Sequence, residues 1–307
     1  MSQLPQTVSI REVGPRDGFQ NEPEVIATDD KVRLVEALGR TGLRRLEVTS
    51  FVRADVIPQL ADAEEVFRRI RRREGVTYSA LVPNDEGLDR ALTARVGKIA
   101  VFTAASETFN RKNTNVGIAE SIERFRTVVP RAQAAGLTVR GYVSTAFWCP
   151  YEGKIEPPAV VDVVKRLLDL GVDEISIGDT IGKAVPGEVH DLLDLLLDAL
   201  AQDRIAMHFH DTYGTAVANA LASYERGISV FDASAGGVGG CPFAPGASGN
   251  VATEDLAWAL TRSGATVGLD LERVSAASDL LASALGRPLR SHVRDALSGK
   301  QAPAPKP

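Results

Sequence analysis

Cysteine is scarce in this chain, since Cys149 and Cys241 are the only two thiols among 307 residues. Two thiols make no disulfide framework, and we therefore expect a reducing compartment. Long apolar runs are also missing, because none approaches the roughly 18 residues that span a membrane. The first seven residues contain neither the apolar core of a signal peptide nor the arginine-rich helix of a transit peptide. These absences predict a cytoplasmic location.

Positive charge is not in excess, because 35 lysines and arginines stand against 40 acidic residues and the net charge is −5. A chain with this balance, and with a pI of about 5.5, lacks the basic footprint of proteins that bind nucleic acid. Hydrophobic residues make up 44% and charged residues 24%, which is ordinary for a globular protein with a sizeable core. The length allows one large α/β barrel or two small domains.

The chain does contain a regular alternation of two kinds of segment. Short β-rich apolar runs predict eight strands, at Val8–Val13, Arg45–Ser50, Thr77–Pro83, Lys98–Thr103, Thr138–Thr145, Glu174–Asp179, Arg204–His210 and Val230–Ala235. Helical spacing follows each of them, at Thr28–Arg40 (with a Thr or Asp cap at its start), Ile57–Arg73, Glu86–Ala94, Ile118–Ala135, Pro157–Leu170, Gly187–Ala201, Thr215–Arg226 and Val251–Thr261. Strands that alternate with helices predict a parallel sheet.

Eight such units in about 255 residues match a (β/α)8 TIM barrel in number and in length. An open doubly wound sheet is the alternative, and it is weakened because no G-x-G-x-x-G turn follows the first strand. We therefore expect a catalytic barrel over residues 1–268 and, packed on it, a helical extension over residues 269–300. Residues 301–307 hold three prolines and are expected to be a disordered tail.

His208 and His210 stand two residues apart at the end of the seventh predicted strand. Residues i and i+2 of a strand point to one face, so both imidazoles project together while Phe209 faces the other way. Paired imidazoles suit a divalent metal ion, and an open coordination position makes such an ion catalytic. The alternative is a purely structural histidine pair. The metal is favoured because ionisable residues gather at the C-terminal ends of the strands, where barrels have their active sites.

Asp17 is the predicted third ligand, because it follows the first strand, which closes the barrel beside the eighth and lies near the seventh. A turn role is the alternative, since Arg-Asp-Gly is good turn chemistry. Asn250 is a candidate fourth ligand, although its spacing favours an N-cap for the helix at Val251–Thr261. Such an oxygen-rich set favours Mg²⁺ or Mn²⁺ over structural Zn²⁺.

Two further features point to the same end of the barrel. Arg16 adjoins Asp17, where a guanidinium can hold the oxygen of a carbonyl or alkoxide. Its alternative role is an ion pair with Glu12 or Glu47.

Residues 236–250 hold six glycines with Cys241 at the centre. A mobile lid that presents this thiol to the site is a better interpretation than a phosphate cradle, because the G-K-[ST] ending is missing.

Six segments together resemble the hydroxymethylglutaryl-CoA lyase family, within the metal-dependent lyase and condensing-enzyme barrels. They are EVGPRDGFQNE (Glu12–Glu22), LEVTSFV (Leu46–Val52), RGYVSTAFWCPYEGK (Arg140–Lys154), EISIGDTIG (Glu174–Gly182), HFHDTYGTAVAN (His208–Asn219) and GGVGGCPFAPGASGNVATEDL (Gly236–Leu256). The last is the most specific, because the wider superfamily shares the histidine motif but not this cysteine loop.

The resemblance implies residue roles that spacing alone does not give. It implies that Asp17, His208, His210 and Asn250 bind Mg²⁺ or Mn²⁺, against the cap interpretation of Asn250. It also implies catalytic roles for Arg16, Glu47, Asp179, His208 and Cys241. Asp179, with His208, would take the proton of the substrate's hydroxyl. Arg16 would stabilise an oxyanion, and Glu47 would orient Arg16. Cys241 would return a proton to the acetyl-CoA carbon.

The implied reaction is the retro-Claisen cleavage of 3-hydroxy-3-methylglutaryl-CoA to acetyl-CoA and acetoacetate, in leucine breakdown or ketone-body formation. A lyase for a longer 3-substituted hydroxyglutaryl-CoA is the nearest alternative, because Phe147, Trp148 and Phe19 depart from the family pattern near the barrel mouth. A condensing enzyme and a non-catalytic metal-binding barrel are the others. The acyl-CoA phosphates are expected near Arg53, Arg111 and Lys112, and the barrel is expected to form a homodimer.

Overall fold

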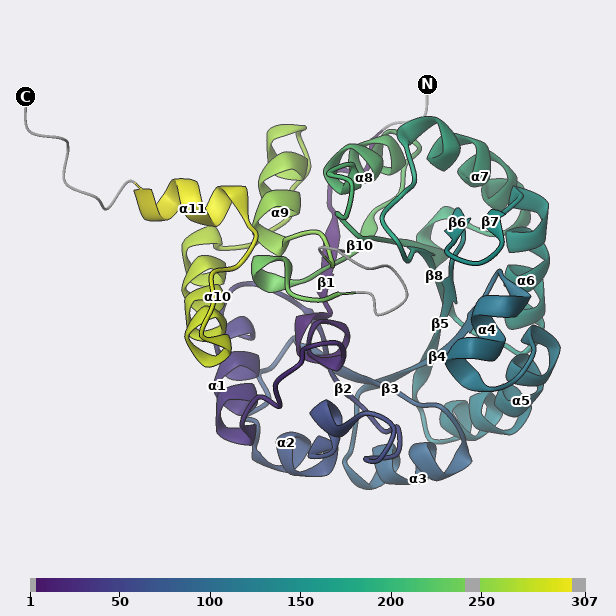
Figure 1. Cartoon of the computed structure of the whole chain (residues 1–307), viewed down its shortest axis with the longest axis horizontal. Coiled ribbons are helices and arrows are strands. Elements are labelled where there is room, and N and C mark those ends of the chain that lie inside the picture. The colour runs from purple at the N-terminus through teal and green to yellow at the C-terminus, as the bar shows by residue number, and fades with distance from the viewer. Residues whose placement is uncertain (1–3, 241–248, 300–307) are drawn as a thin grey trace, which may run out of the picture.

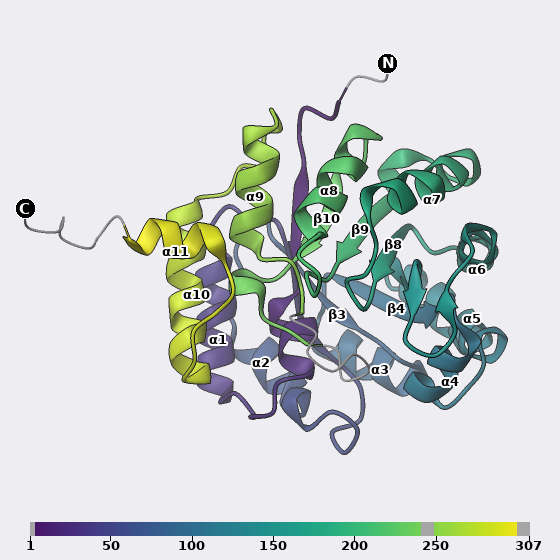
Figure 2. The same ribbon diagram turned by 45° about the horizontal axis from the view of Figure 1, so that its top comes forward.

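Eight parallel strands close into a barrel, which confirms the predicted (β/α)8 fold (Figure 1). The computed structural model describes residues 4–240 and 249–299. Around the barrel the strands follow the order β1-β10-β9-β8-β5-β4-β3-β2, so that β1 pairs with both β10 and β2. Helices form the outer ring, and Figure 2 shows the same closure from a second direction.

The strands lie where the β-rich runs predict them, within two residues at most ends. They are β1 (Ser9–Glu12), β2 (Arg45–Ser50), β3 (Thr77–Leu81), β4 (Lys98–Ala104), β5 (Thr138–Ser144), β8 (Glu174–Asp179), β9 (Ile205–Phe209) and β10 (Val230–Ala233). A small antiparallel pair, β6 (Trp148–Cys149) with β7 (Gly153–Lys154), lies outside the barrel and is not predicted. His210 falls just beyond β9 and forms an isolated bridge with Asn250.

The helices also follow the predicted segments, with some shorter spans. They are α1 (Thr28–Leu38), α2 (Ala63–Arg69), α3 (Asp85–Thr93), α5 (Ile118–Ala134), α6 (Pro157–Asp169), α7 (Pro186–Ala199), α8 (Ala216–Glu225) and α9 (Thr253–Arg262). Helix α4 (Glu107–Thr114) and the five-residue turn of π-helix at Gly14–Gly18, called η1, are additions. The Thr or Asp cap expected for α1 is wrong, because Ala27 occupies the N-cap position without a side-chain bond.

Amphipathic spacing explains why these segments pack as helices on the barrel. In α6, Val160, Val163, Val164 and Leu167 are buried, and they recur at the three- and four-residue intervals of one helix face. Polar residues such as Asp162 and Arg166 occupy the exposed face and pair with each other. Among the described residues, no helix is both long and apolar enough to cross a membrane.

The inside of the barrel is charged rather than filled by branched apolar side chains. Arg11 and Arg140 are among the largest fully buried side chains of the protein, and Asp232 is 2% exposed. Glu174 lies close to four cations: its carboxylate oxygens are 3.0–3.5 Å from nitrogens of Arg11, Arg45, Lys98 and Arg140. A buried charge is tolerated only when it is paired, so this network holds the strand ends in register from within.

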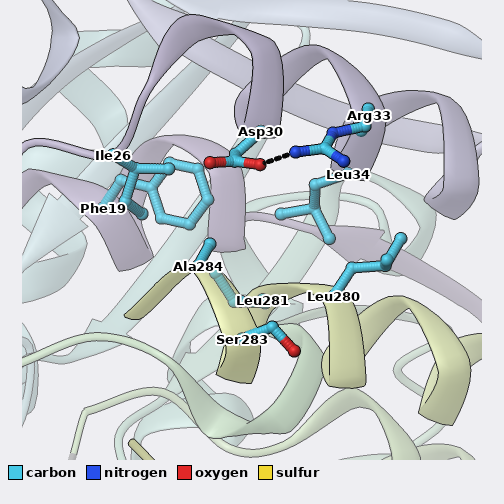
Figure 3. A pocket seen from close by; sticks show the side chains of 9 residues that line it. All are labelled: Phe19, Ile26, Asp30, Arg33, Leu34, Leu280, Leu281, Ser283 and Ala284. Atoms are coloured by element: carbon cyan, nitrogen blue, oxygen red, sulfur yellow. Dashed lines mark hydrogen bonds and ion pairs between the residues drawn. The ribbon is translucent and has the colours of Figure 1, made fainter. Parts of the chain in front are cut away.

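Helices α10 (Leu271–Leu285) and α11 (His292–Gly299) follow the barrel. Helix α10 packs along α1 and α9 (Figure 1). Between α10 and α1 lies a pocket of about 230 Å³, where Leu280 and Leu281 lie across from Leu34 and the rim carries the Asp30–Arg33 ion pair (Figure 3). Phe19, which follows η1, also lines it. The predicted tail at 301–307 lies outside the described residues.

Candidate active site

The turn η1 brings Arg16 and Asp17 over the C-terminal mouth of the barrel. Its turn is closed by the carbonyl of Val13, which accepts from the backbone N–H groups of Arg16, Asp17 and Gly18 at 3.1, 2.7 and 3.3 Å. A Cβ at position 14 would lie 2.6 Å from Glu12 Oε1, so a larger residue there would displace that carboxylate. Glu12 ties the turn to the segment that follows the neighbouring strand β10, by accepting from Gly14 N and Ala235 N, both at 2.9 Å.

The two histidines project to one side of the sheet, as their spacing predicts. Their ring centroids are 5.2 Å apart, and both residues are at least nine-tenths buried. Phe209 lies between them in sequence and packs the other way, with its ring 6.3 Å from that of Phe147. The alternation of the strand therefore gathers two imidazoles at the barrel mouth.

Asp17 completes a three-residue cluster with them. Its Oδ2 lies 3.9 Å from Nε2 of His208 and 3.9 Å from Nε2 of His210. One ligand atom from each of the three residues falls within 4.8 Å of the others, which suits a single ion. Two imidazoles and a carboxylate are a donor set for a divalent metal with open positions for other ligands.

Asn250 adjoins this cluster and does not cap a helix. Residues 249–251 run alongside the end of β9, because Asp211 N donates to Gly249 O and Val251 N donates to Phe209 O. The cap interpretation is wrong, since α9 begins at Thr253 with Ala252 at its N-cap. Asn250 Nδ2 donates to Asp17 Oδ2 at 3.0 Å, while its buried Oδ1 has no hydrogen-bond partner. A half-turn of the amide would present that oxygen to the cluster, so Asn250 fits a fourth ligand position.

Arg16 is fixed by two carboxylates and by an aromatic ring. Its Nε donates to Glu47 Oε1 at 2.5 Å and its Nη1 to Asp17 Oδ1 at 2.6 Å. Its guanidinium carbon lies 5.2 Å from the centroid of the Tyr142 ring, and the hydroxyl of Tyr142 donates to Glu47 Oε2 at 3.0 Å. Of the two ion pairs considered for Arg16, the one with Glu47 is formed, whereas Glu12 has other partners.

Arg16 and Asp17 each stabilise the charged form of the other. Burial opposes ionisation of Asp17, but Arg16 and the two histidines outweigh it and hold the pKa of that carboxyl well below its usual range. Burial likewise disfavours the charged guanidinium, yet Glu47 and Asp17 keep the pKa of Arg16 above its usual value. The pKa of His210 is lowered, chiefly by burial. Asp17 is therefore an anion and His210 favours the neutral form, as metal ligands must be.

Asp179 does not line the pocket of the site. Its side chain is fully buried, and its two carboxylate oxygens accept from Lys183 N and Ala184 N at 3.1 and 3.0 Å. Burial raises the pKa of this carboxyl to about 6. On β8, alternation turns Asp179 away from the pocket, whereas its neighbours Gly178 and Thr180 line it.

The predicted thiol and the predicted phosphate contacts have separate outcomes. Cys241 lies outside the described residues. Arg53 and Arg111 are exposed and paired with Asp55 and Glu107, while Lys112 lies over the ring of Tyr151. None of these three cations lines the pocket of the site. Tyr142, to which the sequence analysis gives no role, contacts Arg16 from the fifth strand, as the alternation of that strand allows.

The site opens into a pocket of about 330 Å³ with two unlike walls. The ligand cluster and Arg16 form the polar wall. The other wall is apolar and comes from the strands and loops of the β2–β4 side and from α4: Val52, Val56, Ile57, Leu81, Phe102 and Phe109. Such a cavity takes an organic ligand whose oxygen atoms meet the cation and the metal site while its carbon skeleton faces the apolar wall.

Comparisons with known proteins match nearly the whole chain. The family model described as HMGL-like matches residues 7–281. The chain is 48% identical over 287 residues to hydroxymethylglutaryl-CoA lyase YngG of Bacillus subtilis, covering 94% of this chain and 96% of that one. It is 46% identical to the mitochondrial hydroxymethylglutaryl-CoA lyase of Rattus norvegicus, covering 96% and 91%.

A solved structure adds a ligand-bound relative. An HMG-CoA lyase from Acinetobacter baumannii, solved in complex with coenzyme A and 3-methylmalate, superposes with a TM-score of 0.93 at 38% identity. The match covers 100% of both chains. More distant structures, such as the carboxyl transferase domain of Rhizobium etli pyruvate carboxylase at 19% identity and a TM-score of 0.69, show a shared fold alone.

Proposed function

The chain belongs to the HMGL-like family, and from this premise we propose that it is a carbon–carbon lyase that cleaves 3-hydroxy-3-methylglutaryl-CoA. The products are acetyl-CoA and acetoacetate, and the reaction is a retro-Claisen cleavage. The observation that carries the proposal is that Asp17, His208 and His210 converge beside a fixed Arg16. They do so at the C-terminal ends of the strands, where barrels of this fold have their active sites.

Asp17, His208, His210 and Asn250 are the proposed metal ligands. The nearness of the first three and the unpartnered Oδ1 of Asn250 support this assignment. Two oxygen ligands and an open site favour Mg²⁺ or Mn²⁺ over structural Zn²⁺. When bound, such an ion lowers the pKa of a coordinated hydroxyl and polarises a neighbouring oxygen.

Arg16 is proposed to hold the oxyanion that develops as the carbon–carbon bond breaks. Its Nη2 is not used by Glu47 or Asp17 in the hydrogen bonds that fix the other nitrogens, so the guanidinium has a donor left for substrate. Glu47 is proposed to position it, because that carboxylate holds both Arg16 and Tyr142 from behind and is itself fully buried. A donor held in place before the reaction stabilises the transition state without a cost of reorganisation.

The remaining catalytic candidates are His208, Asp179 and Cys241, and they concern the transfer of protons. His208 is proposed as a metal ligand. Asp179, with His208 among its charge neighbours, is proposed to take the proton of the substrate hydroxyl, and this role rests on the family resemblance. The carboxylate of Asp179 also holds the turn 180–184 by accepting from Lys183 N and Ala184 N. Cys241 is retained as the donor that returns a proton to the acetyl-CoA carbon, and this role rests on the family resemblance.

The remaining parts of the proposal concern partners and location. An acyl-CoA is the proposed substrate, supported by the coenzyme A of the Acinetobacter baumannii relative and by the apolar wall of the pocket. The homodimer and the cytoplasmic location expected from the sequence are also part of the proposal. The scarcity of cysteine supports the location.

The test is a coupled assay for acetoacetate with purified full-length protein and Mg²⁺. The proposal expects product from 3-hydroxy-3-methylglutaryl-CoA, and a much lower rate with a substrate in which a longer chain replaces the 3-methyl group. Faster turnover of the longer substrate would overturn the substrate assignment. Cys241→Ala is expected to lose product formation while it keeps metal affinity, which tests the thiol separately from the metal site.

A further inference from the structure

Asp232 is a fully buried carboxylate on β10 that none of the proposed catalytic steps uses. It lies directly behind His208, because Asp232 and His208 are register partners on adjacent strands. Its Oδ2 is 3.2 Å from Nδ1 of His208. The same carboxylate accepts from Arg140 Nη2 at 2.7 and 2.9 Å and from Ser176 Oγ at 3.0 Å. All four side chains come from neighbouring or facing strands inside the barrel.

We propose that Asp232 is a positioning residue that orients the proposed metal ligand His208 and fixes which of its ring nitrogens carries a proton. An anionic oxygen opposite Nδ1 requires a proton on that nitrogen. Nε2 of His208, which faces Asp17, is thereby left with its lone pair for a metal ion. This inference rests on the proposed metal site and names the group that prepares it.

The support of the carboxylate is what makes the orientation rigid. Arg140 is 0% exposed and contacts both oxygens of Asp232, so the carboxylate has no freedom to turn away from the histidine. The far side of the same guanidinium lies 3.2 Å from Glu174, which ties it to the opposite end of the barrel interior. A carboxylate held in this way fixes the orientation of the imidazole that it contacts.

His210 shows by contrast that the arrangement is specific to one ligand. Its Nδ1 is buried and has no hydrogen-bond partner, although its Nε2 is as near to Asp17 as that of His208. Only one of the two imidazoles is therefore held from behind by a carboxylate. We expect the loss of Asp232 to alter His208 and to leave the ring of His210 unchanged.

The first test needs no variant of Asp232. The protein has four histidines, so long-range ¹H–¹⁵N correlation spectra of the metal-free full chain at pH 8 give few ring signals, and the spectrum of His208→Gln assigns the one of interest. The inference expects a proton on Nδ1 of His208. A His208 ring with its only proton on Nε2 would overturn the inference, whatever the variants do.

The second test measures affinity for Mn²⁺ by electron paramagnetic resonance of the free ion. Asp232→Asn is expected to weaken Mn²⁺ binding by about 10- to 100-fold, as the loss of a carboxylate behind a histidine ligand typically does. The matched control is Glu174→Gln, which removes another buried carboxylate partner of Arg140 without touching His208. Its affinity should stay within about threefold of the wild type.

The outcomes separate this inference from the proposed function. Equal Mn²⁺ affinity of wild type and Asp232→Asn would overturn the positioning role and leave the metal site standing. Equal weakening by both variants would also overturn it, since the loss would then come from the general network. A wild-type protein that binds no Mn²⁺ would instead refute the metal site of the proposed function. If Asp232→Asn does not fold, the histidine spectrum of the wild type decides alone.

Discussion

Replacement of Arg16 by glutamine removes the cation that faces the pocket and keeps a polar side chain in its place. Arg16 is 6% exposed and its guanidinium is held by Glu47 and Asp17 at 2.5 and 2.6 Å, so its position does not depend on substrate. A shorter, neutral amide reaches neither the oxyanion nor both carboxylates. The substitution should therefore affect the transition state more than the binding of substrate.

The expected magnitude follows from the role of a fixed donor in a buried site. Removing one oxyanion donor costs about 10²–10³ in kcat, or about 2.7–4 kcal/mol. Glu47 would lose an ionic partner and keep only the hydroxyl of Tyr142, which should cost about 1–3 kcal/mol of stability. Metal affinity should not fall, because Asp17 loses a cation that competes with the ion for its charge.

The assay measures kcat and KM for acetoacetate formation at saturating Mg²⁺, with the free energy of unfolding measured in urea alongside. The matched control is Arg11→Gln, which removes another buried arginine but leaves Glu174 with Arg45, Lys98 and Arg140 as partners. This control should lose stability and keep kcat within a few-fold. An Arg16→Gln enzyme with kcat within threefold of the wild type would refute the oxyanion role.

Three further outcomes are expected. Gly249→Ala should weaken Mn²⁺ binding, measured by calorimetry, because its Cβ would lie 2.3 Å from Gly239 O and would push Asn250 away from Asp17; unchanged binding would count against Asn250 as a ligand. Burial raises the pKa of Glu12 to about 7, above its ordinary 4.5, so its stability contribution is present below pH 4.5 and is lost as the pH rises through 7. Urea unfolding at pH 5 and pH 8 should therefore show a smaller loss of stability in Glu12→Gln than in the wild type, and an equal loss would contradict the assignment. Asp179→Ala should lower the free energy of unfolding by about 1–3 kcal/mol, because Lys183 N and Ala184 N lose their acceptors; a variant as stable as the wild type would remove the turn-holding role.

The fold follows from local pattern because each unit carries its own signals. Alternation of β-rich runs with amphipathic segments sets the order of the elements, and closure of the barrel follows once there are eight of them. The two histidines are predictable for the same reason, since strand alternation alone puts His208 and His210 on one face. Asp17 follows from the rule that strand C-termini share one end of the barrel.

The features that sequence pattern misses depend on contacts between distant segments. Asn250 reads as a helix cap by spacing, and only the pairing of residues 249–251 with the end of β9 sets it beside His210. The end of β8 is predictable, but the hydrogen bonds by which the carboxylate of Asp179 accepts from Lys183 N and Ala184 N are not. The charged barrel interior is likewise invisible locally, because Arg140 and Asp232 are 92 residues apart and meet only across the closed sheet.

The central claim is that Asp17, His208 and His210 hold one divalent ion which the cleavage reaction requires. The direct test strips the protein with EDTA, adds back Mn²⁺ in steps, and measures both the bound ion per chain and the initial rate of acetoacetate formation in each sample. The account predicts no turnover without metal and a rate that rises in proportion to occupancy up to one ion per chain, with neither binding nor turnover in Asp17→Asn. Full turnover by metal-free protein, or tight Mn²⁺ binding by Asp17→Asn, would contradict it.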